Sequence, residues 1–360
     1  LGKRDMLELL RVLPMSAHQY LNGHFENDAL KGLLGSVSVT GLMQGPRASG
    51  AAFMLLYQQL GGTNGGYRSS RIVRGGVGKV SEALAAALKA HSGEIRTGAS
   101  VSKILVERHR IVGLRLDSGD EIEANLILSS ADPRTTFFGL LGGPELSPRI
   151  VRRLRSLKQR GSTASVHLAL SDLPDFPSAN GDAKRLTGAI VICPDMDYAE
   201  RAYDDAKYGR ISTAPILEVR IPSLLDQSLA PGGQHTMSIV FRYAPYHLRD
   251  SGWDTQHEKL GDLAIETLNE YAPNLKHITL NRKVITPLDY ERDYRLAEGS
   301  IMHGQMGLDQ LLLMRPVPGF IGYRSPVSGL YLCGAGAHPG GGLTGLPGLN
   351  AAKQASQETS

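Results

Sequence analysis

The residue types best suited to ligand chemistry gather near the carboxyl end of the chain, in residues 334–348. This segment holds Gly334, Gly342 and Gly345, and His338 lies among them. Glycine lacks a Cβ atom, so its backbone can approach a flat ligand closely. We expect a helix to begin near Gly345, which would add free N–H groups and a partial positive charge. The segment predicts either a cradle for a flat ring that gains negative charge on reduction, as a flavin does, or a purely structural glycine loop.

A nicotinamide-type dinucleotide site is a different interpretation of the same segment. Residues 340–345 match the pattern GxGxxG. That pattern marks a Rossmann unit only when it follows a strand and precedes a helix, a second strand and an acidic residue ~20 positions further on. The sequence runs only to Ser360, so we expect no such unit here.

Side chains that could act as acids, bases or nucleophiles are scattered along the chain. His338 can titrate near neutral pH and is the one candidate for a general base, although its neighbours favour a structural role in the loop. His303 and Asp309 share a segment in which we expect local hydrogen bonds. The spacing shows no Ser/His/Asp, Cys/His or metal-ligand constellation. We therefore expect a bound cofactor, rather than side chains, to carry the chemistry.

Composition places the chain among ordinary globular proteins. Of 360 residues, 41% are apolar and 21% are charged, which excludes a disordered chain. Glycine is enriched, at 42 residues or about 12%, against a usual ~7%. The net charge of +4 arises from basic residues spread along the chain, so we expect no nucleic-acid partner. Cys193 and Cys333 lie far apart, which excludes a disulfide framework and favours a reducing compartment.

One segment is unusually poor in charge. Between residues 32 and 67 only Arg47 is charged. The segment either packs as a pair of helices or forms an apolar wall beside a ligand, and the sequence leaves both open. No apolar run approaches 18 residues, so we expect no membrane-spanning helix.

Periodicity predicts the elements that must position these residues. We expect helices in the first seventy residues and at 79–91, where Val80, Leu84 and Leu88 share one face. Alternation and turn residues predict a three-stranded antiparallel meander with strands at 101–107, 111–116 and 121–129. The remaining expected elements are strands at 166–170, 216–220, 237–242 and 329–333, a helix at 255–271, and a surface loop over most of 173–206.

Six motifs together resemble one family. They are RGGVG at 74–78, SADP at 130–133, GSIMHG at 299–304, LDQL at 308–311, RPVPG at 315–319 and LYLCGAGAHPGGG at 330–342. The first two and the last, together with residues 101–128, are similar to the FAD-dependent phytoene desaturase and carotenoid isomerase group, within the wider amine-oxidase-like flavoproteins. The other three are similar to one branch of that group specifically. Within this group the chain most resembles the branch named pyridine nucleotide-disulfide oxidoreductase domain-containing protein 2. The motifs follow the family order along nearly the whole chain.

The resemblance implies an α/β (α+β) flavoprotein of the FAD/NAD(P)-binding type. Residues 71–136 and 325–360 would form part of an FAD-binding domain that includes the meander. Residues 1–70 and 137–324 would form a substrate domain of mixed sheet plus helices. Val101 would contact the adenine through its backbone, near Ser130 and Ala131. The other implied cofactor contacts are Gly334, Ala335, Gly336, Gly342, Thr344, Gly345 and Leu346.

The implied activity is FAD-dependent oxidoreduction, of desaturase, dehydrogenase or isomerase type, on an apolar, polyene-like substrate. Two alternatives stay open: flavin-dependent amine oxidation, and a non-catalytic regulatory or interaction module on the same scaffold. The family opens with a βαβ unit that this sequence lacks, so we expect the chain alone to bind FAD weakly. We also consider a peripheral membrane contact, a protein partner or a homo-oligomer. The location would be cytoplasmic in a bacterium and the mitochondrial matrix in a eukaryote.

Overall fold

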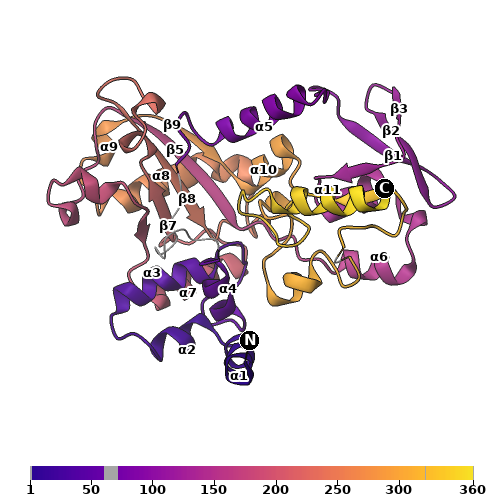
Figure 1. The fold of residues 1–360 in the computed structure, drawn as a ribbon. Helices are drawn as coiled ribbons and strands as arrows, with labels where there is room; N and C mark the ends of the chain where they lie inside the picture. Colours follow the sequence, from indigo (N-terminus) through magenta and orange to yellow (C-terminus); the bar gives the residue numbers. More distant parts are fainter. Residues whose placement is uncertain (1, 61–71, 321, 360) are drawn as a thin grey trace. The chain divides into compact units, whose positions relative to one another are not determined.

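The structure is a computed structural model that describes residues 2–60, 72–320 and 322–359. The chain divides into two compact units, each built from two separate stretches of sequence. Unit 1 comprises Leu1–Glu94 and Ser162–Asp289, and unit 2 comprises Ile95–Gly161 and Tyr290–Ser360. Helices and sheets are mixed in both units (Figure 1), which agrees with the predicted α/β (α+β) class.

Unit 1 is built on a five-stranded antiparallel sheet with the strand order β6-β7-β8-β5-β9. Alternate residues of the interior strand β5 enter the core, so Val166 and Leu168 are buried while His167 is exposed. α8 (Trp253–Asn269) adds its apolar face to the same core. The strands are β5 (Thr163–Leu170), β6 (Ile190–Ile192), β7 (Leu217–Arg220), β8 (His235–Arg242) and β9 (Thr279–Ile285).

Short helices complete unit 1. They are α1 (Lys3–Val12), α2 (Ala17–Asn22), α3 (Asp28–Ser38), α4 (Ala51–Tyr57), α5 (Gly78–Ala90), α7 (Met196–Lys207) and α9 (Leu275–Ile278). β6 and most of α7 lie within residues 173–206, so the prediction of a surface loop there was wrong in part. α7 begins at an N-cap, where Asp195 accepts a hydrogen bond from the Tyr198 N–H at 2.6 Å. Among the described residues, no helix is long and apolar enough to cross a bilayer.

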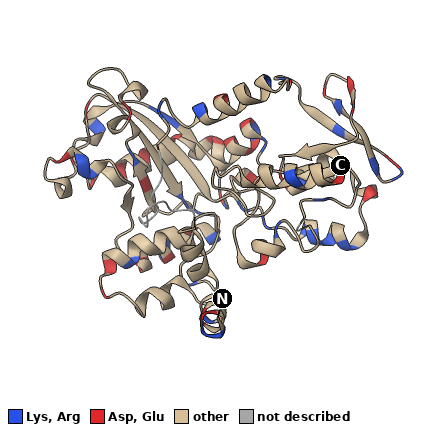
Figure 2. Cartoon of the chain, viewed as in Figure 1, with Lys and Arg blue, Asp and Glu red and all other residues tan. Residues whose placement is uncertain are grey.

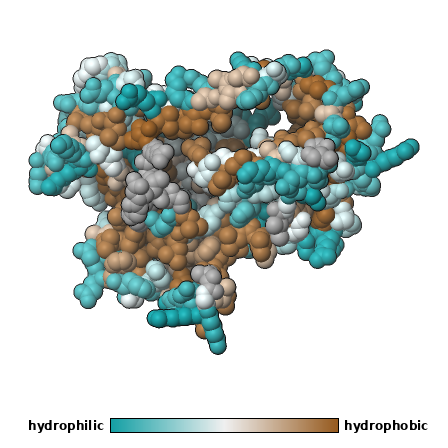
Figure 3. Space-filling model, in the orientation of Figure 1, coloured by the Kyte–Doolittle hydropathy of each residue, from teal (hydrophilic) through white to brown (hydrophobic). Residues whose placement is uncertain are grey.

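The segment that is poor in charge forms α3 and α4. A Cβ atom at Gly32 would lie 2.3 Å from the Cys193 carbonyl oxygen, so only glycine lets α3 pack this closely. Leu55 of α4 is buried, whereas Leu56 and Leu60 are exposed. Figure 3 shows apolar side chains on the visible surface over α3 and α4. Helix packing therefore explains the lack of charge in one part of this segment, and another part forms an apolar surface. Residues 61–67 of the segment lie outside the described residues.

α5 is the predicted helix that follows the RGGVG motif. Its apolar residues share one face, as predicted, but that face is on the surface of the unit: Val80, Leu84 and Leu88 are 44%, 67% and 47% exposed. No residue of α5 is buried. The pattern thus predicted the helix correctly, but it could not indicate whether another element packs against the apolar face of the helix.

Unit 2 contains the predicted meander, with one correction. β1 (Val101–Glu107), β2 (Arg110–Leu116) and β3 (Glu121–Glu123) form an antiparallel sheet in that order. The sequence predicts a third strand from 121 to 129, but the chain leaves the meander after Glu123. β4 (Ile127–Ser129) instead pairs in parallel with β10 (Leu330–Leu332), so the prediction was wrong for Leu128. Alternation shows that a segment is extended and does not show which strand it pairs with.

Three helices and a π-helical turn lie wholly or partly in unit 2. They are α6 (Pro148–Arg155), α10 (Pro287–Tyr294), which crosses the boundary between the units, α11 (Leu346–Thr359) and η1 (Thr135–Leu140). In the core of unit 2, Phe137 and Phe320 meet edge-on with ring centroids 5.4 Å apart. α11 begins one residue after Gly345, as predicted.

The compact units differ from the expected domains. Residues 72–94 belong to unit 1, where the Gly75 N–H donates to the Asp226 carboxylate at 2.5 Å. Residues 137–161 and 290–324 belong to unit 2, since hydrogen bonds and core contacts join these stretches to each other. The assignment of an FAD-binding and a substrate domain stays a prediction about function.

A buried ion pair in the sheet of unit 1 yields a stability prediction. Glu218 contacts the buried Arg242 at 2.7 Å and the more exposed Arg220 at 3.3 Å. Glu218→Leu leaves the Arg242 guanidinium buried without this carboxylate, so we expect the free energy of unfolding to fall by about 3–5 kcal/mol. Arg220→Leu should cost at most about 1 kcal/mol, because that contact faces solvent. Urea unfolding followed by circular dichroism measures both, and equal losses would contradict the assignment.

Candidate cofactor site

The parallel pair β4–β10 brings two of the predicted segments together. A Cβ atom at Gly334 would lie 2.2 Å from the Ser130 carbonyl oxygen. A Cβ atom at Gly336 would lie 2.5 Å from Cδ of Pro133. These two glycines are therefore required because the chain packs closely on itself, and for them the structural explanation suffices.

The second half of the glycine-rich segment is open. A Cβ atom at Gly342 would meet only Cγ2 of Thr344, at 3.9 Å, and one at Gly345 would meet nothing within 4 Å. Their φ angles are +119° and +68°, in the region that favours glycine. Residues 342–346 are all exposed. Bare backbone is thus accessible to a ligand here, and not at Gly334 or Gly336.

The amino end of α11 adjoins this open backbone. The Leu346 N–H donates to Oγ1 of Thr344 at 3.3 Å. Pro347 has no N–H, so Leu346 and Gly348 supply the donors at the start of the helix. The positive end of the helix dipole therefore lies beside residues 342–345 and favours negative charge there.

A buried carboxylate fixes the chain that follows β4. Asp132 is only 3% exposed. It accepts hydrogen bonds from the backbone N–H groups of Arg134 at 2.9 Å and Thr135 at 3.2 Å, and from the Thr135 hydroxyl. Nε2 of Gln159 also donates to it, at 3.1 Å. The SADP motif by itself predicted no role for Asp132, although an aspartate before a helical turn is a capping signal.

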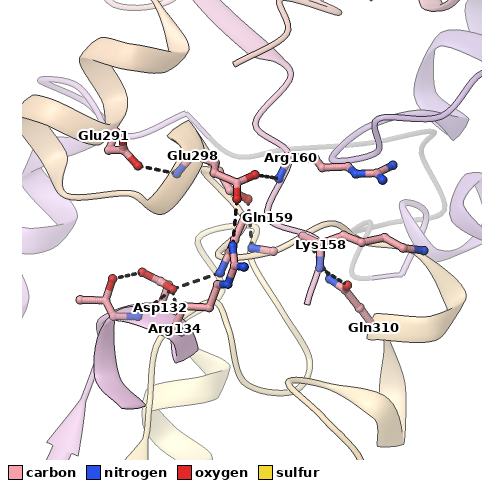
Figure 4. A network of polar contacts seen from close by, with 11 residues as sticks. Asp132, Arg134, Lys158, Gln159, Arg160, Glu291, Glu298 and Gln310 are labelled. Atoms are coloured by element: carbon pink, nitrogen blue, oxygen red, sulfur yellow. Dashed lines mark hydrogen bonds and ion pairs between the residues drawn. The ribbon is translucent and has the colours of Figure 1, made fainter. Parts of the chain in front are cut away.

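Further polar contacts tie this turn to two other segments of unit 2 (Figure 4). Arg134 forms an ion pair with Glu298 at 2.9 Å, and Glu298 also accepts from the Arg160 N–H at 3.0 Å. The Lys158 N–H donates to Oε1 of Gln310 at 2.6 Å. The network joins residues far apart in the sequence, so spacing gave no signal for it.

A buried cation holds the glycine-rich segment from its other side. Arg315, of the RPVPG motif, is 2% exposed. Its guanidinium donates to the carbonyl oxygens of Ala335 at 2.9 Å, Gln310 at 3.1 Å and Met302. A planar guanidinium that bonds three carbonyls restricts the path of the chain at Ala335.

Several buried polar atoms beside this segment lack a hydrogen-bond partner among the described residues. They are Nδ1 of His303, Nδ1 of His338, Oε1 of Gln159 and both amide atoms of Gln305. A buried polar atom without a hydrogen bond destabilises the fold unless a water molecule or a ligand supplies the missing bond. Burial lowers the pKa of His303; the Asp132 carboxylate opposes this and Arg315 adds to it. His303 is therefore neutral near pH 7. No motif in the sequence pointed to Gln159 or Gln305.

Among the described residues, none of the hydrogen bonds or strand pairings joins Val101 to the glycine-rich segment. Val101 opens β1 opposite Leu116, whereas the link from the meander to β10 is made elsewhere, by the Ile111 N–H bonding the Ser328 carbonyl oxygen at 3.0 Å. The meander also lines an open hollow of about 1170 Å³ together with residues 141–145. Its lining includes Lys103, Arg115 and Glu121, and none of the predicted cofactor contacts.

The close approach at Gly334 can be tested by a single methyl group. Gly334→Ala would drive a Cβ atom into the Ser130 backbone, which cannot swing away, so we expect a loss of about 1–3 kcal/mol in unfolding free energy. Gly348→Ala is the matched control, because its Cβ atom would lie 3.9 Å from the nearest atom, in a helix that favours alanine. Thermal unfolding distinguishes them; a neutral Gly334→Ala would rule out the packing described here.

Comparison with known proteins places these features in a family. The family described as "Flavin containing amine oxidoreductase" matches residues 39–354. Over 350 residues the chain is 38% identical to pyridine nucleotide-disulfide oxidoreductase domain-containing protein 2 of Rattus norvegicus, covering 95% of this chain and 60% of that protein. It is 26% identical over 356 residues to the zeta-carotene-forming phytoene desaturase of Myxococcus xanthus, covering 96% and 63%.

The chain thus spans about three fifths of the length of these relatives. Among solved structures, an oxidoreductase from Methanosarcina mazei matches with a TM-score of 0.63 at 19% identity, over 99% of this chain and 73% of that one. The predicted flavoprotein fold, the resemblance to the desaturase group and FAD as the family's cofactor are confirmed. The chain belongs to the family of flavin-containing amine oxidoreductases.

Proposed function

We propose that this chain provides flavin and substrate contacts of an FAD-dependent oxidoreductase acting on an apolar, polyene-like substrate. The observation that carries the proposal is the exposed backbone of residues 342–345 beside the amino end of α11, in a chain of this family. When bound, the flavin would supply the chemistry by accepting hydride or electrons. The protein would bind, orient and desolvate the reactants.

The residues of unit 2 fit a flavin. Gly342 and Gly345 present backbone without side chains. The amino end of α11, where the Leu346 N–H already bonds Oγ1 of Thr344, favours a ring edge that becomes negative through the helix dipole and the Gly348 N–H. We propose that these residues and Thr344 hold the ring, and that Ser130, Ala131 and Val101 serve the adenine side. The unpartnered buried nitrogens of His303 and His338 support a ligand or ordered water nearby.

Gly334, Ala335 and Gly336 take a different role in this proposal. Gly334 and Gly336 pack against the chain after β4, and Arg315 fixes Ala335. They would act as positioning residues that set the path of the segment ahead of Gly342. Asp132 does the same for Ser130 and Ala131 from the opposite strand.

Two observations support an apolar substrate. The segment from residue 32 to residue 60 has Arg47 as its only charge, and it exposes Leu56 and Leu60 on unit 1. The phytoene desaturase of Myxococcus xanthus is named for forming zeta-carotene, and the chain resembles it over 96% of its own length. An apolar polyene would bind by burial of its surface, without a charged partner.

Amine oxidation is the second candidate, supported by the family's description. Amine sites often use aromatic rings around the cation. Trp253, the one tryptophan, is 5% exposed in the core of unit 1, where its Nε1–H donates to the Tyr246 carbonyl oxygen at 3.0 Å. It is not available to an amine, which makes this candidate the weaker one.

Anaerobic reduction of the flavin-loaded protein tests the function. We would mix it with a detergent-dispersed polyene or with a primary amine and follow the long-wavelength flavin absorption band. Bleaching by the polyene alone supports the proposal, and bleaching by the amine alone replaces it with amine oxidation. Full flavin binding without bleaching by either would favour the non-catalytic module.

The placement of α11 predicts an effect on the flavin's reduction potential. Gly345→Asp would put a carboxylate where reduced flavin gains negative charge, so the potential should fall, by about 30 mV for each 1.4 kcal/mol of repulsion, or binding should be lost. Gly345→Asn has the same shape and also tolerates positive φ, so it controls for strain. Spectroscopic redox titration measures both variants. An unchanged potential at full occupancy in Gly345→Asp would reject the placement.

A further inference from the structure

The helix α6 lies in the most basic part of the chain. Residues 149–160 contain six basic side chains, and no acidic residue occurs between Glu145 and Asp172. Four of the six are arginines within α6: Arg149, Arg152, Arg153 and Arg155. Figure 2 shows the blue of basic residues along α6.

Packing turns these arginines toward solvent. Leu154 is buried in the core of unit 2, and Ile150 and Val151 pack against that core. Because a helix turns 100° per residue, Arg149 and Arg152 fall on the opposite side of α6, and Arg153 and Arg155 fall on its two flanks. Arg149, Arg152 and Arg155 are exposed.

These three exposed arginines have no acidic partner among the described residues. Nearby groups are already engaged: Arg153 donates to the Pro318 carbonyl oxygen at 2.8 Å, and Asp309 pairs with Lys158 at 2.7 Å. The positive charge of the face is therefore uncompensated.

An exposed apolar segment, called the apolar tip below, follows a residue that is hydrogen-bonded to Lys158, three residues beyond the end of α6. The Lys158 N–H donates to Oε1 of Gln310 at 2.6 Å, and Nε2 of Gln310 donates back to the Lys158 carbonyl oxygen at 3.1 Å. Two residues beyond Gln310 begins η9 (Leu312–Met314). Its side chains are exposed in succession: Leu312 42%, Leu313 61% and Met314 42%.

We propose that this α6–η9 surface, formed by Arg149, Arg152 and Arg155 with residues 312–314, docks on an anionic lipid bilayer. Arginines attract anionic headgroups, and exposed leucine and methionine side chains enter the boundary between headgroups and acyl chains. An acidic protein or a nucleic acid would use the arginines and would leave the apolar tip in water, so the combination favours lipid. Docking does not depend on which substrate the enzyme oxidises, but it would bring the chain to the phase in which an apolar substrate dissolves.

Vesicle co-sedimentation of the whole chain tests the charged half of the surface. We expect binding to phosphatidylcholine vesicles that contain phosphatidylglycerol, weakened by salt, and little binding to phosphatidylcholine alone. The triple variant Arg149→Gln, Arg152→Gln, Arg155→Gln should lower the partition coefficient about a hundredfold. The matched control Arg4→Gln, Arg201→Gln, Arg249→Gln removes the same charge from exposed positions of unit 1 and should change it far less.

A second variant tests the apolar half. Leu313→Ser should weaken binding to the anionic vesicles about tenfold, whereas Leu225→Ser, 51% exposed in unit 1, should not. Circular dichroism would verify that all variants keep the fold, since every changed side chain is exposed. The proposal would be overturned if the chain bound neutral and anionic vesicles equally, or if the control triple variant lost as much vesicle binding as the α6 triple variant. It would also be overturned if Leu313→Ser left vesicle binding unchanged and the chain bound polyglutamate or RNA as tightly as anionic vesicles.

Discussion

The parallel pairing of β4 with β10 is the constraint on which the candidate site depends. Its register sets Leu330 opposite Ile127 and Leu332 opposite Ser129, across about two hundred residues of sequence. Because the strands are parallel, their carboxyl ends meet at one edge, and the chain that follows each strand continues there. Ligands of open α/β sheets bind at such edges. The pairing therefore decides where the SADP motif and the glycine-rich segment meet.

Two buried charges keep these segments in register. Asp132 is held by N–H and hydroxyl groups, and Arg315 by carbonyl oxygens. A buried ionised group is tolerated when hydrogen bonds replace the water it has lost, and it then fixes the backbone it bonds. Asp132 raises and Arg315 lowers the pKa of His303, and burial of the ring lowers it further, so that the imidazole is neutral. The polar interior of unit 2 thus acts as scaffolding for the exposed backbone at 342–345.

The glycines of one segment serve two purposes that the sequence cannot separate. Gly334 and Gly336 are glycines because the neighbouring backbone and Pro133 occupy the place of a Cβ atom. Gly342 and Gly345 are glycines in positive-φ turns, with open space around them. All four look alike in the sequence, and only the packed chain shows which of them can face a ligand.

The sequence by itself determined the local elements and the family. Periodicity located the meander through Glu123, the strands β5, β7 and β8, and the start of α11, because each pattern depends on neighbours a few residues away. The tertiary structure alone decided the partner of β4, the exposed face of α5, the boundaries of the two units and the contacts of Asp132 and Arg315. The β4–β10 pairing joins residues about two hundred positions apart, and Asp132 and Arg315 bond residues as much as 27 and 20 positions away. A local pattern encodes which face is apolar without encoding what covers it.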